Sequence, residues 1–168
     1  MKLTIAPNGN LQIDEARITY RNFQGAPSKY NRKGERNFVL IIPTEEIADI
    51  LVNDKNKYGK GWNVHIKEPK EPGDSRFMYL PVKVAFNDRG PAIYLRTKYK
   101  RTLLNEDLVD ILDSIDIDHV DLDIRPYDGD GEGFGSGPFR SAYLAGMEVF
   151  QIVDRFEERY AMEEHPEE

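Results

Sequence analysis

The chain has 168 residues, of which 39% are hydrophobic and 32% charged, and its aromatic residues are 8 Phe, 9 Tyr and 1 Trp. This composition supplies the core of one domain and excludes wholesale disorder. The absence of cysteine excludes disulfides, thiolate zinc sites and cysteine nucleophiles. No apolar run reaches the roughly 20 residues of a membrane-spanning helix, and residues 1–8 reach a polar turn before a signal-peptide core can form. A soluble cytoplasmic protein is therefore expected.

The formal charge of −7 is unevenly distributed along the chain. Residues 1–101 hold 19 Lys and Arg against 11 Asp and Glu, whereas residues 102–168 hold 4 Arg against 19 acidic residues. Such asymmetry indicates a surface that binds a polyanion together with an acidic appendage, although charges that drifted apart on a solvated surface give the same counts. Residues 154–168 contain 7 acidic residues and 2 Arg, and they predict a mobile C-terminal tail.

The first half of the chain predicts two strands, a basic loop and a helix. Apolar alternation predicts a first strand over residues 11–20, broken by a bulge near residues 14–15. Residues 22–35 combine Gly, Pro and basic residues without an apolar period, which is typical of a loop. Residues 37–42 are apolar on both faces and predict a central, covered strand. A helix is expected next, with Thr44 as its N-cap.

The middle of the chain continues with strands. Residues 62–67 alternate and place Trp62 on the apolar side of a strand. Residues 77–86 and 92–101 follow as a strand pair. Asn105 is expected to cap a second helix, because apolar residues at helical spacing follow it.

The last predicted elements are strands over residues 120–125 and 141–150, which flank a Gly-rich loop over residues 129–138. About seven strands and two short helices predict a mainly β fold. A small, partly open β-barrel of the oligonucleotide-binding (OB) type accommodates this inventory. We therefore expect one domain over residues 1–153, followed by the acidic tail over residues 154–168.

Basic and aromatic residues alternate on the predicted strands. If residues 93–100 form one regular strand, Tyr94, Arg96, Lys98 and Lys100 share a face. Basic and aromatic residues also occur together on the first strand, in the loop after it, and on the strand over residues 77–86. The predicted nucleic-acid interface comprises Arg17, Arg21, Phe23, Lys29, Tyr30, Arg32, Lys33, Arg36, Trp62, Tyr79, Lys83, Tyr94, Arg96, Lys98 and Lys100.

This combination matches single-stranded nucleic acid, because cations neutralise phosphates while aromatic faces stack on bases of any sequence. Structural explanations remain open for each member. Tyr79 and Tyr94 also fit the exposed polar face of a sheet, and Trp62 also fits the core, since it shares its face with apolar residues. The loop over residues 29–36 also fits ordinary solvated charge.

The acidic half offers two catalytic or metal-binding candidates. Residues 128–133 carry acids and glycine at the spacing of a calcium loop, but the twelfth position is Phe139 instead of a carboxylate, which favours a flexible hairpin loop. The aspartates of residues 116–123 are compatible with a two-metal nuclease, yet Asp121 and Asp123 also fit a solvated strand face. No nucleotide-binding or hydrolase motif occurs, so neither an enzyme nor a cofactor is predicted.

Four segments of the chain resemble one protein family. They are residues 18–23 (ITYRNF), 29–38 (KYNRKGERNF), 61–64 (GWNV) and 123–127 (DIRPY). Over about residues 12–150, their order and local sequence are similar to those of phage single-stranded DNA-binding proteins of the OB fold. The resemblance implies a barrel, a role in phage replication or recombination in the host cytoplasm, and a tail that recruits partner proteins. Many such tails end in an acidic-aromatic tip, whereas this chain ends in His-Pro-Glu-Glu.

The expected function is sequence-tolerant binding of single-stranded DNA. The first alternative is an interaction module of a replication or recombination complex, whose acidic half contacts a basic partner. A metal-dependent nuclease is a more distant alternative. An open strand edge would also allow a homo-oligomer to form.

Overall fold

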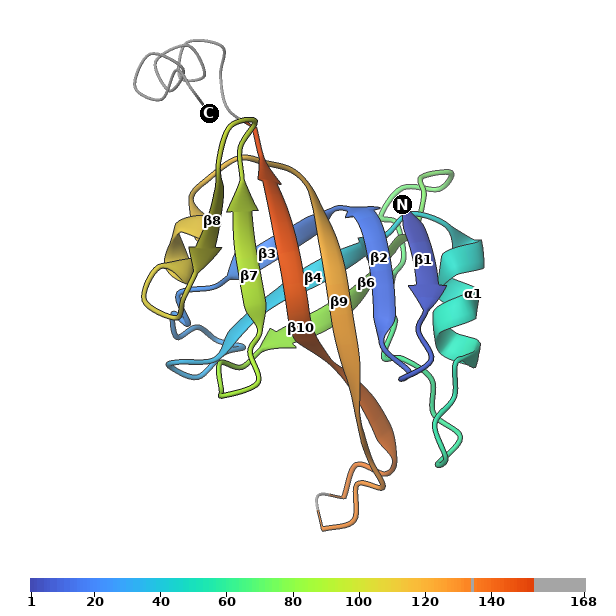
Figure 1. Ribbon diagram of the computed structural model, residues 1–168. Helices are drawn as coiled ribbons and strands as arrows, with labels where there is room; N and C mark the ends of the chain where they lie inside the picture. The colour runs from blue at the N-terminus through green and yellow to red at the C-terminus, as the bar shows by residue number, and fades with distance from the viewer. Residues whose placement is uncertain (134, 153–168) are drawn as a thin grey trace.

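A computed structural model describes residues 1–133 and 135–152, and this part of the chain is mainly β, as predicted (Figure 1). The elements are β1 (Lys2–Ile5), β2 (Leu11–Ala16), β3 (Ile18–Asn22), β4 (Arg36–Ile42), α1 (Glu45–Asn53), β5 (His65–Lys67), β6 (Phe77–Val84), β7 (Ala92–Arg96), β8 (Arg101–Leu104), the 3-10 helix η1 (Val109–Asp113), β9 (Ile117–Gly129) and β10 (Phe139–Gln151). The tail predicted over residues 154–168 lies outside the described residues.

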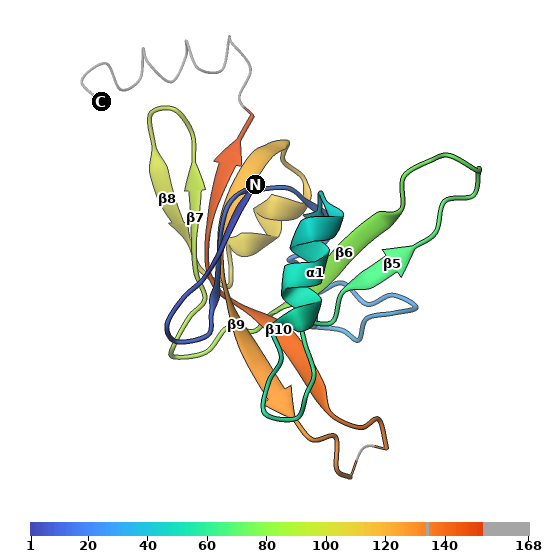
Figure 2. The ribbon, with the colours of Figure 1, turned by 90° about the vertical axis from the view of Figure 1, so that its right-hand side faces the viewer.

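The described strands form one sheet organised around β10. The order along the sheet is β1-β2-β9-β10-β6-β4-β3, with β5 on β6 and the β7–β8 hairpin on β10. One edge of β10 pairs with antiparallel β9 over its length, while its other edge pairs with parallel β6 near the start and with parallel β7 near the end. Because that second edge is shared, the sheet divides into two layers, with β7 and β8 in one layer and β5 and β6 in the other (Figure 2).

The hydrophobic core lies between these two layers. Its residues occupy alternate positions along the strands. Every second residue of β6, from Met78 to Val84, is buried, and β4 and β9 show the same period of two. Helix α1 lies over the opening between the layers (Figure 2) and buries Ala48 and Leu51. Thr44 is the N-cap, as predicted, and its hydroxyl accepts a hydrogen bond from the Ile47 amide.

The predicted barrel is not closed in the described part of the chain. The path of paired strands begins at β1 and ends at β3, and no pairing between these two strands joins the ends. The predicted first strand is two strands, β2 and β3, and the register of β2 against β9 shifts between Ile13 and Ala16, close to the expected bulge. Strand β1 was not predicted; it has only four residues, and none of them is fully buried.

The prediction of a second α-helix is wrong, because the segment after Asn105 forms only the short 3-10 helix η1. The Asn105 side chain accepts hydrogen bonds from two amides that follow it, so the expected polar cap is present. The Arg21 guanidinium donates to the carbonyl oxygens of Leu112 (2.7 Å) and Ile115 (2.9 Å). These contacts satisfy carbonyl groups at the end of η1 without another helical turn.

Two strand predictions in the middle of the chain also need correction. The strand predicted over residues 92–101 ends at Arg96, and the chain turns back, with the Thr97 amide donating to the Lys100 carbonyl (2.9 Å). The strand predicted from Trp62 begins only at His65, because the Trp62 amide donates to the last turn of α1 instead. None of the described helices is long and apolar enough to cross a membrane.

Candidate nucleic-acid interface

A ring flanked by two cations lies on the outer face of the sheet where β6, β10 and β9 meet. The strand register places Tyr143 of β10 beside Lys83 of β6 and opposite Arg125 of β9. The Lys83 Nζ lies 5.7 Å from the centroid of the Tyr143 ring, and the Arg125 Cζ lies 4.9 Å from it. Both distances are typical of cation–π contacts. The ring is thus held between two positive groups from different strands.

Aromatic side chains extend this arrangement toward the tip of the β9–β10 hairpin. The Tyr127 ring meets Tyr143 edge-on, with centroids 5.7 Å apart, and it lies 6.0 Å from the Phe139 ring. Tyr127 is 53% exposed, so a large part of its surface is accessible to a ligand. We call Lys83, Arg125, Tyr127 and Tyr143 the outer row.

Two hollows flank the outer row. One, of about 490 Å³, is lined by Asn37, Lys83, Phe86 and Tyr143 together with Arg36. The other, of about 420 Å³, lies beside Arg125 and is lined on its far side by the turn over residues 87–90. The outer row therefore forms the floor between two concave regions, an arrangement suited to an extended polymer.

Arg36 lies in the first hollow but is largely engaged within the protein. Its Nε donates to the Phe23 carbonyl (2.9 Å), and its Nη1 pairs with Glu106 (3.1 Å). The guanidinium also covers the Phe86 ring at 5.5 Å. Arg36 therefore shapes the wall of the hollow, where its charge is paired with that of Glu106, another lining residue.

The basic loop between β3 and β4 is held in place by short internal contacts. The Gly34 amide donates to the Gly25 carbonyl (2.8 Å), and a Cβ on Gly25, whose φ is +72°, would lie 3.0 Å from the Gly34 Cα. The Asn37 side chain donates to the Asn31 side chain (2.9 Å), which fixes the loop to β4. The close approach favours glycine at position 25, whereas at position 34, where a Cβ would meet no atom, the positive φ of +90° favours it.

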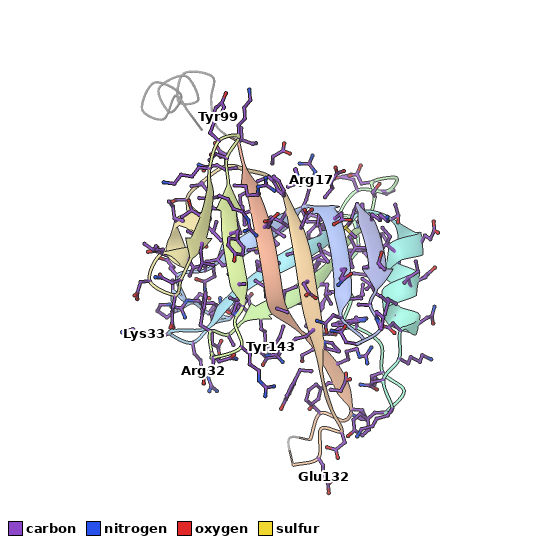
Figure 3. All side chains as sticks on the ribbon, in the orientation of Figure 1. Arg17, Arg32, Lys33, Tyr99, Glu132 and Tyr143 are labelled. Atoms are coloured by element: carbon purple, nitrogen blue, oxygen red, sulfur yellow. The ribbon has the colours of Figure 1, made fainter. Side chains whose placement is uncertain are left out.

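The loop presents its cations on the side of the molecule that carries Tyr143. Figure 3 shows Arg32 and Lys33 on this side, far from Arg17. Tyr30 is 85% exposed, and the Lys29 ammonium lies 5.7 Å from the centroid of its ring. The loop and the outer row therefore face the same region of solvent.

Tyr79 lies on the same face of β6 as Lys83, as the alternation predicted. Its ring is stacked between His65 and Phe77, at centroid distances of 5.0 and 5.2 Å. This stack extends the aromatic surface of β6 away from the outer row.

Three predicted interface residues serve the fold instead of facing a ligand. Phe23 is 0% exposed and stacks on Phe38, and Trp62 is 3% exposed with its Nε1 donating to Asp54 (2.8 Å). Neither ring is accessible to a base, which agrees with the core explanation for Trp62. The Arg21 guanidinium is hydrogen-bonded to carbonyl groups at the end of η1. Arg17 is exposed at the opposite end of the sheet from Tyr143 (Figure 3).

The remaining predicted cations gather around the β7–β8 hairpin. Arg96 lies 5.4 Å from the Phe150 ring, and Tyr94 is covered by Arg101 at 3.5 Å. Lys98 and Lys100 lie in the turn between the strands, so they do not continue the face of Tyr94 as a regular strand would. The predicted interface is therefore divided between two places on the sheet.

A polar network braces the base of the β9–β10 hairpin, which projects from the body (Figure 1). The Arg140 guanidinium donates to both oxygens of Asp128 (2.8 and 3.1 Å) and to Asp54. Asn56 also donates to Asp128 (3.0 Å). Burial raises the pKa of the Asp128 carboxyl, but the hydrogen bonds from Arg140 and Asn56 outweigh it and leave that pKa below its usual value.

The aspartates considered for metal binding hold the β1–β2 hairpin in place. Asp121 accepts a hydrogen bond from the Glu15 amide, and Asp123 accepts one from the Asn10 side chain, each at 3.0 Å. Among the described residues, no three His, Cys, Asp or Glu side chains are grouped as a metal ion requires. Two of the aspartates that a nuclease would use, Asp121 and Asp123, thus make hydrogen bonds within the fold.

Tyr143, Arg125 and Tyr127 were not among the predicted site residues. Alternation within residues 141–150 was enough to place Tyr143 opposite the apolar face of its strand. The sequence pattern does not give the register of β10 against β6 and β9. Only this register brings Lys83 and Arg125 to the Tyr143 ring. The parallel pairing of β10 with β6 joins residues 60 positions apart, and no local signal indicates it.

Known proteins resemble the chain in sequence pattern and in fold. The pattern of a family described as "Putative phage ssDNA-binding domain" matches residues 2–167. The comparison with curated proteins gives no match.

Three solved structures share the fold. The single-stranded DNA-binding protein from bacteriophage Enc34 in complex with ssDNA has a TM-score of 0.54 and 14% identity, covering 92% of this chain and 93% of that one. A C-terminal truncation of the Enc34 protein has a TM-score of 0.55 and 16% identity, covering 92% and 97%. The Enc34 protein without that truncation has a TM-score of 0.51 and 16% identity, covering 93% of each chain.

These structures show the shared fold, and the family pattern extends over nearly the whole sequence. The chain belongs to the family of phage ssDNA-binding domains.

Proposed function

We propose that this protein binds single-stranded DNA without sequence preference, along the outer row and the basic loop before β4. The observation that carries the proposal is the Tyr143 ring, which lies between the cations of Lys83 and Arg125 on the outer face of three strands. Family membership supports single-stranded DNA as the ligand.

The chemistry of the outer row suits a single strand. The exposed ring of Tyr127 and the Arg125 guanidinium that lies over Tyr143 offer stacking surfaces for bases, and each stacked base contributes about 1–3 kcal/mol. Lys83 and Arg125 supply positive charge next to those rings, where the phosphates of a stacked strand pass. A duplex hides the faces of its bases, so we expect it to bind more weakly.

The path of the strand continues from the outer row to the basic loop. Arg32 and Lys33 lie on the same side as Tyr143 (Figure 3), and the exposed ring of Tyr30 adds a third stacking surface. The hollow lined by Asn37 and Lys83 lies between the two regions. This path uses five of the predicted residues: Lys29, Tyr30, Arg32, Lys33 and Lys83.

The wider role is binding without catalysis or a cofactor, in the replication or recombination of phage DNA in the host cytoplasm. The phage family supports this role. The single open sheet, divided into two layers with the core between them, supports an OB-type arrangement. The proposal includes recruitment of replication or recombination proteins by the acidic tail over residues 154–168, and a homo-oligomer formed through an open strand edge.

A variant of Tyr143 tests the proposal. Anisotropy of a labelled 30-nucleotide single strand should show that Tyr143→Ala weakens binding roughly 5- to 150-fold, the loss expected for one stacked base. Tyr58→Ala is the matched control, since Tyr58 is a partly exposed ring beside a lysine, on the segment between α1 and β5 and outside the outer row. Equal affinity of the native protein and Tyr143→Ala would reject the outer row as the interface.

A further inference from the structure

The arrangement around Tyr143 occurs a second time on β10, around Phe150. The register places Phe150 opposite His119 of β9 on one side and beside Arg96 of β7 on the other. The His119 ring stacks on Phe150 with centroids 4.2 Å apart and an angle of 14° between the planes, and the Arg96 Cζ lies 5.4 Å from the Phe150 centroid. An aromatic ring of β10 is again flanked by nitrogen-bearing groups of both neighbouring strands.

Tyr143 and Phe150 face the same side of the sheet because β10 contains a bulge. In a regular strand, residues seven positions apart point to opposite faces. The register with β9 shifts between Leu144 and Gly146, and the buried residues change from Ala142 and Leu144 to odd-numbered positions after the shift. Both rings therefore belong to the outer face, about 23 Å apart along the strand.

The second ring has two accessible arginines on its β7 side, whereas on its β9 side the His119 Nδ1 lies 2.6 Å from the Asp118 carboxylate, and Asp14, Glu15 and Asp121 line the adjacent hollow. The side chains of Arg96 and Arg101 are 45% and 51% exposed, and Glu148 pairs with both of them at 3.5 and 2.7 Å. One carboxylate thus faces two guanidinium groups, so the pair of arginines retains a net positive charge. Lys98 and Lys100 follow in the adjacent turn. We call Arg96, Arg101, His119 and Phe150 the upper row.

Acidic residues separate the two rows. Asp123 is opposite Gly146, and Asp121 is opposite Glu148, so three carboxylates occupy the outer face between Tyr143 and Phe150. A DNA backbone that crossed this face in a straight line would bring phosphates against these carboxylates, which is unfavourable. The two rows are thus more suitable for separate segments of a strand than for one continuous track.

We infer that the upper row is a second binding site for single-stranded DNA, so that one chain holds two separate segments. Arginine and histidine planes, like aromatic rings, stack on unpaired bases, and the stack of His119, Phe150 and Arg96 offers such surfaces beside positive charge. This inference rests on the proposed function, which uses the outer row alone. Holding two segments allows one protein to bridge two strands or to loop one strand.

Stoichiometry with short oligonucleotides tests the inference. A three-nucleotide oligo-dT is too short, even fully extended, to cover both rows at the separation given above, so calorimetry of the full chain at low salt should give two oligonucleotides per chain. Arg96→Gln with Arg101→Gln should reduce this number to one. Arg76→Gln is the matched control, because Arg76 also pairs with two carboxylates at the surface, and it should retain two.

The outcomes separate this inference from the proposed function. One oligonucleotide per native chain, or two after the Arg96 and Arg101 changes, would overturn the second site and leave the outer row intact. No binding of single-stranded DNA to the native chain would reject the proposed function itself. A second variant, Lys98→Gln with Lys100→Gln, should weaken only the second binding event, and thermal unfolding checks that each variant is folded.

Discussion

Lys83 and Arg125 come from strands on opposite sides of β10, yet both contact the same ring, Tyr143. Neither contact is local in sequence, and each depends on how β10 pairs with its neighbours. The arrangement gives one exposed region the two properties that a single strand requires, a stacking surface and positive charge. Variants can distinguish base stacking from charge neutralisation, and can distinguish both from residues that only support the fold.

Lys83 should act through phosphate neutralisation. Removing one phosphate contact lowers the dependence of binding on salt, by about 0.7 in the slope of log K against log salt for a single strand. Lys83→Ala should therefore reduce this slope by about that amount, measured by anisotropy between about 50 and 200 mM salt. Tyr143→Ala should leave the slope unchanged while lowering affinity. An unchanged slope in Lys83→Ala would show that Lys83 does not contact phosphate.

Arg21 should matter for stability more than for DNA binding. Its guanidinium satisfies two carbonyl groups at the end of η1, and hydrogen bonds from charged groups contribute about 1.5–3 kcal/mol. Arg21→Ala should lower the free energy of unfolding by about that amount in urea denaturation, with little change in affinity at temperatures where the variant is folded. A loss of affinity without a loss of stability would show that Arg21 belongs to the DNA interface.

Trp62 provides a fluorescence signal from inside the protein. Its ring is almost fully buried and its Nε1 donates to Asp54, so bound bases do not reach it. Single-stranded DNA should change Trp62 emission little, even when anisotropy shows that the DNA is saturated. Strong quenching on binding would mean that the segment around Trp62 opens to the ligand.

The pair of Asp128 and Arg140 should make stability depend on pH in the acid range. The pKa of Asp128 is lowered in the folded state, so the ionised carboxylate stabilises the fold above its unfolded pKa of about 4. That contribution is lost as the pH falls through the lower, folded pKa. Asp128→Asn should be less stable than the native protein at pH 7, and its stability should fall less between pH 5 and pH 2.

Asp130→Asn is the control for this pH experiment. Asp130 lies two residues further along the same hairpin, and its carboxylate accepts the Glu132 amide. Native-like acid dependence is expected in this variant. If Asp128→Asn and the native protein lose stability in parallel as the pH falls, the ion pair with Arg140 does not contribute as described.

Local alternation was sufficient to predict much of the sheet. It placed Tyr79 and Lys83 on one face of β6, and it placed Asp121 and Asp123 on the solvated face of β9. Thr44 was recognisable as an N-cap, because its residue type and position carry the chemistry of the cap. These features depend on neighbours within a few residues, which is the range that sequence patterns describe.

Features that depend on pairing between distant strands were not predictable in this way. The bulge in β10 brings Phe150 to the face of Tyr143, and its only sequence signal is the small pair Ala145 and Gly146. The end of β7 at Arg96 was missed, because residues 93–100 continue to alternate through the turn. The prediction of a partly open barrel agrees with the unpaired ends of the sheet, but strand composition does not reveal which strands pair with each other.

Photocrosslinking is the most direct test of where the strand lies. A single strand containing 5-bromodeoxyuridine is irradiated with the native protein, and the crosslinked peptides are identified by mass spectrometry. Adducts on Tyr143 or Tyr127, lost in excess unlabelled single strand but not in excess duplex, are the predicted result. Adducts confined to α1 and the β1–β2 hairpin, with residues 125–143 unmodified, would contradict the assignment of the outer row as the DNA-binding surface.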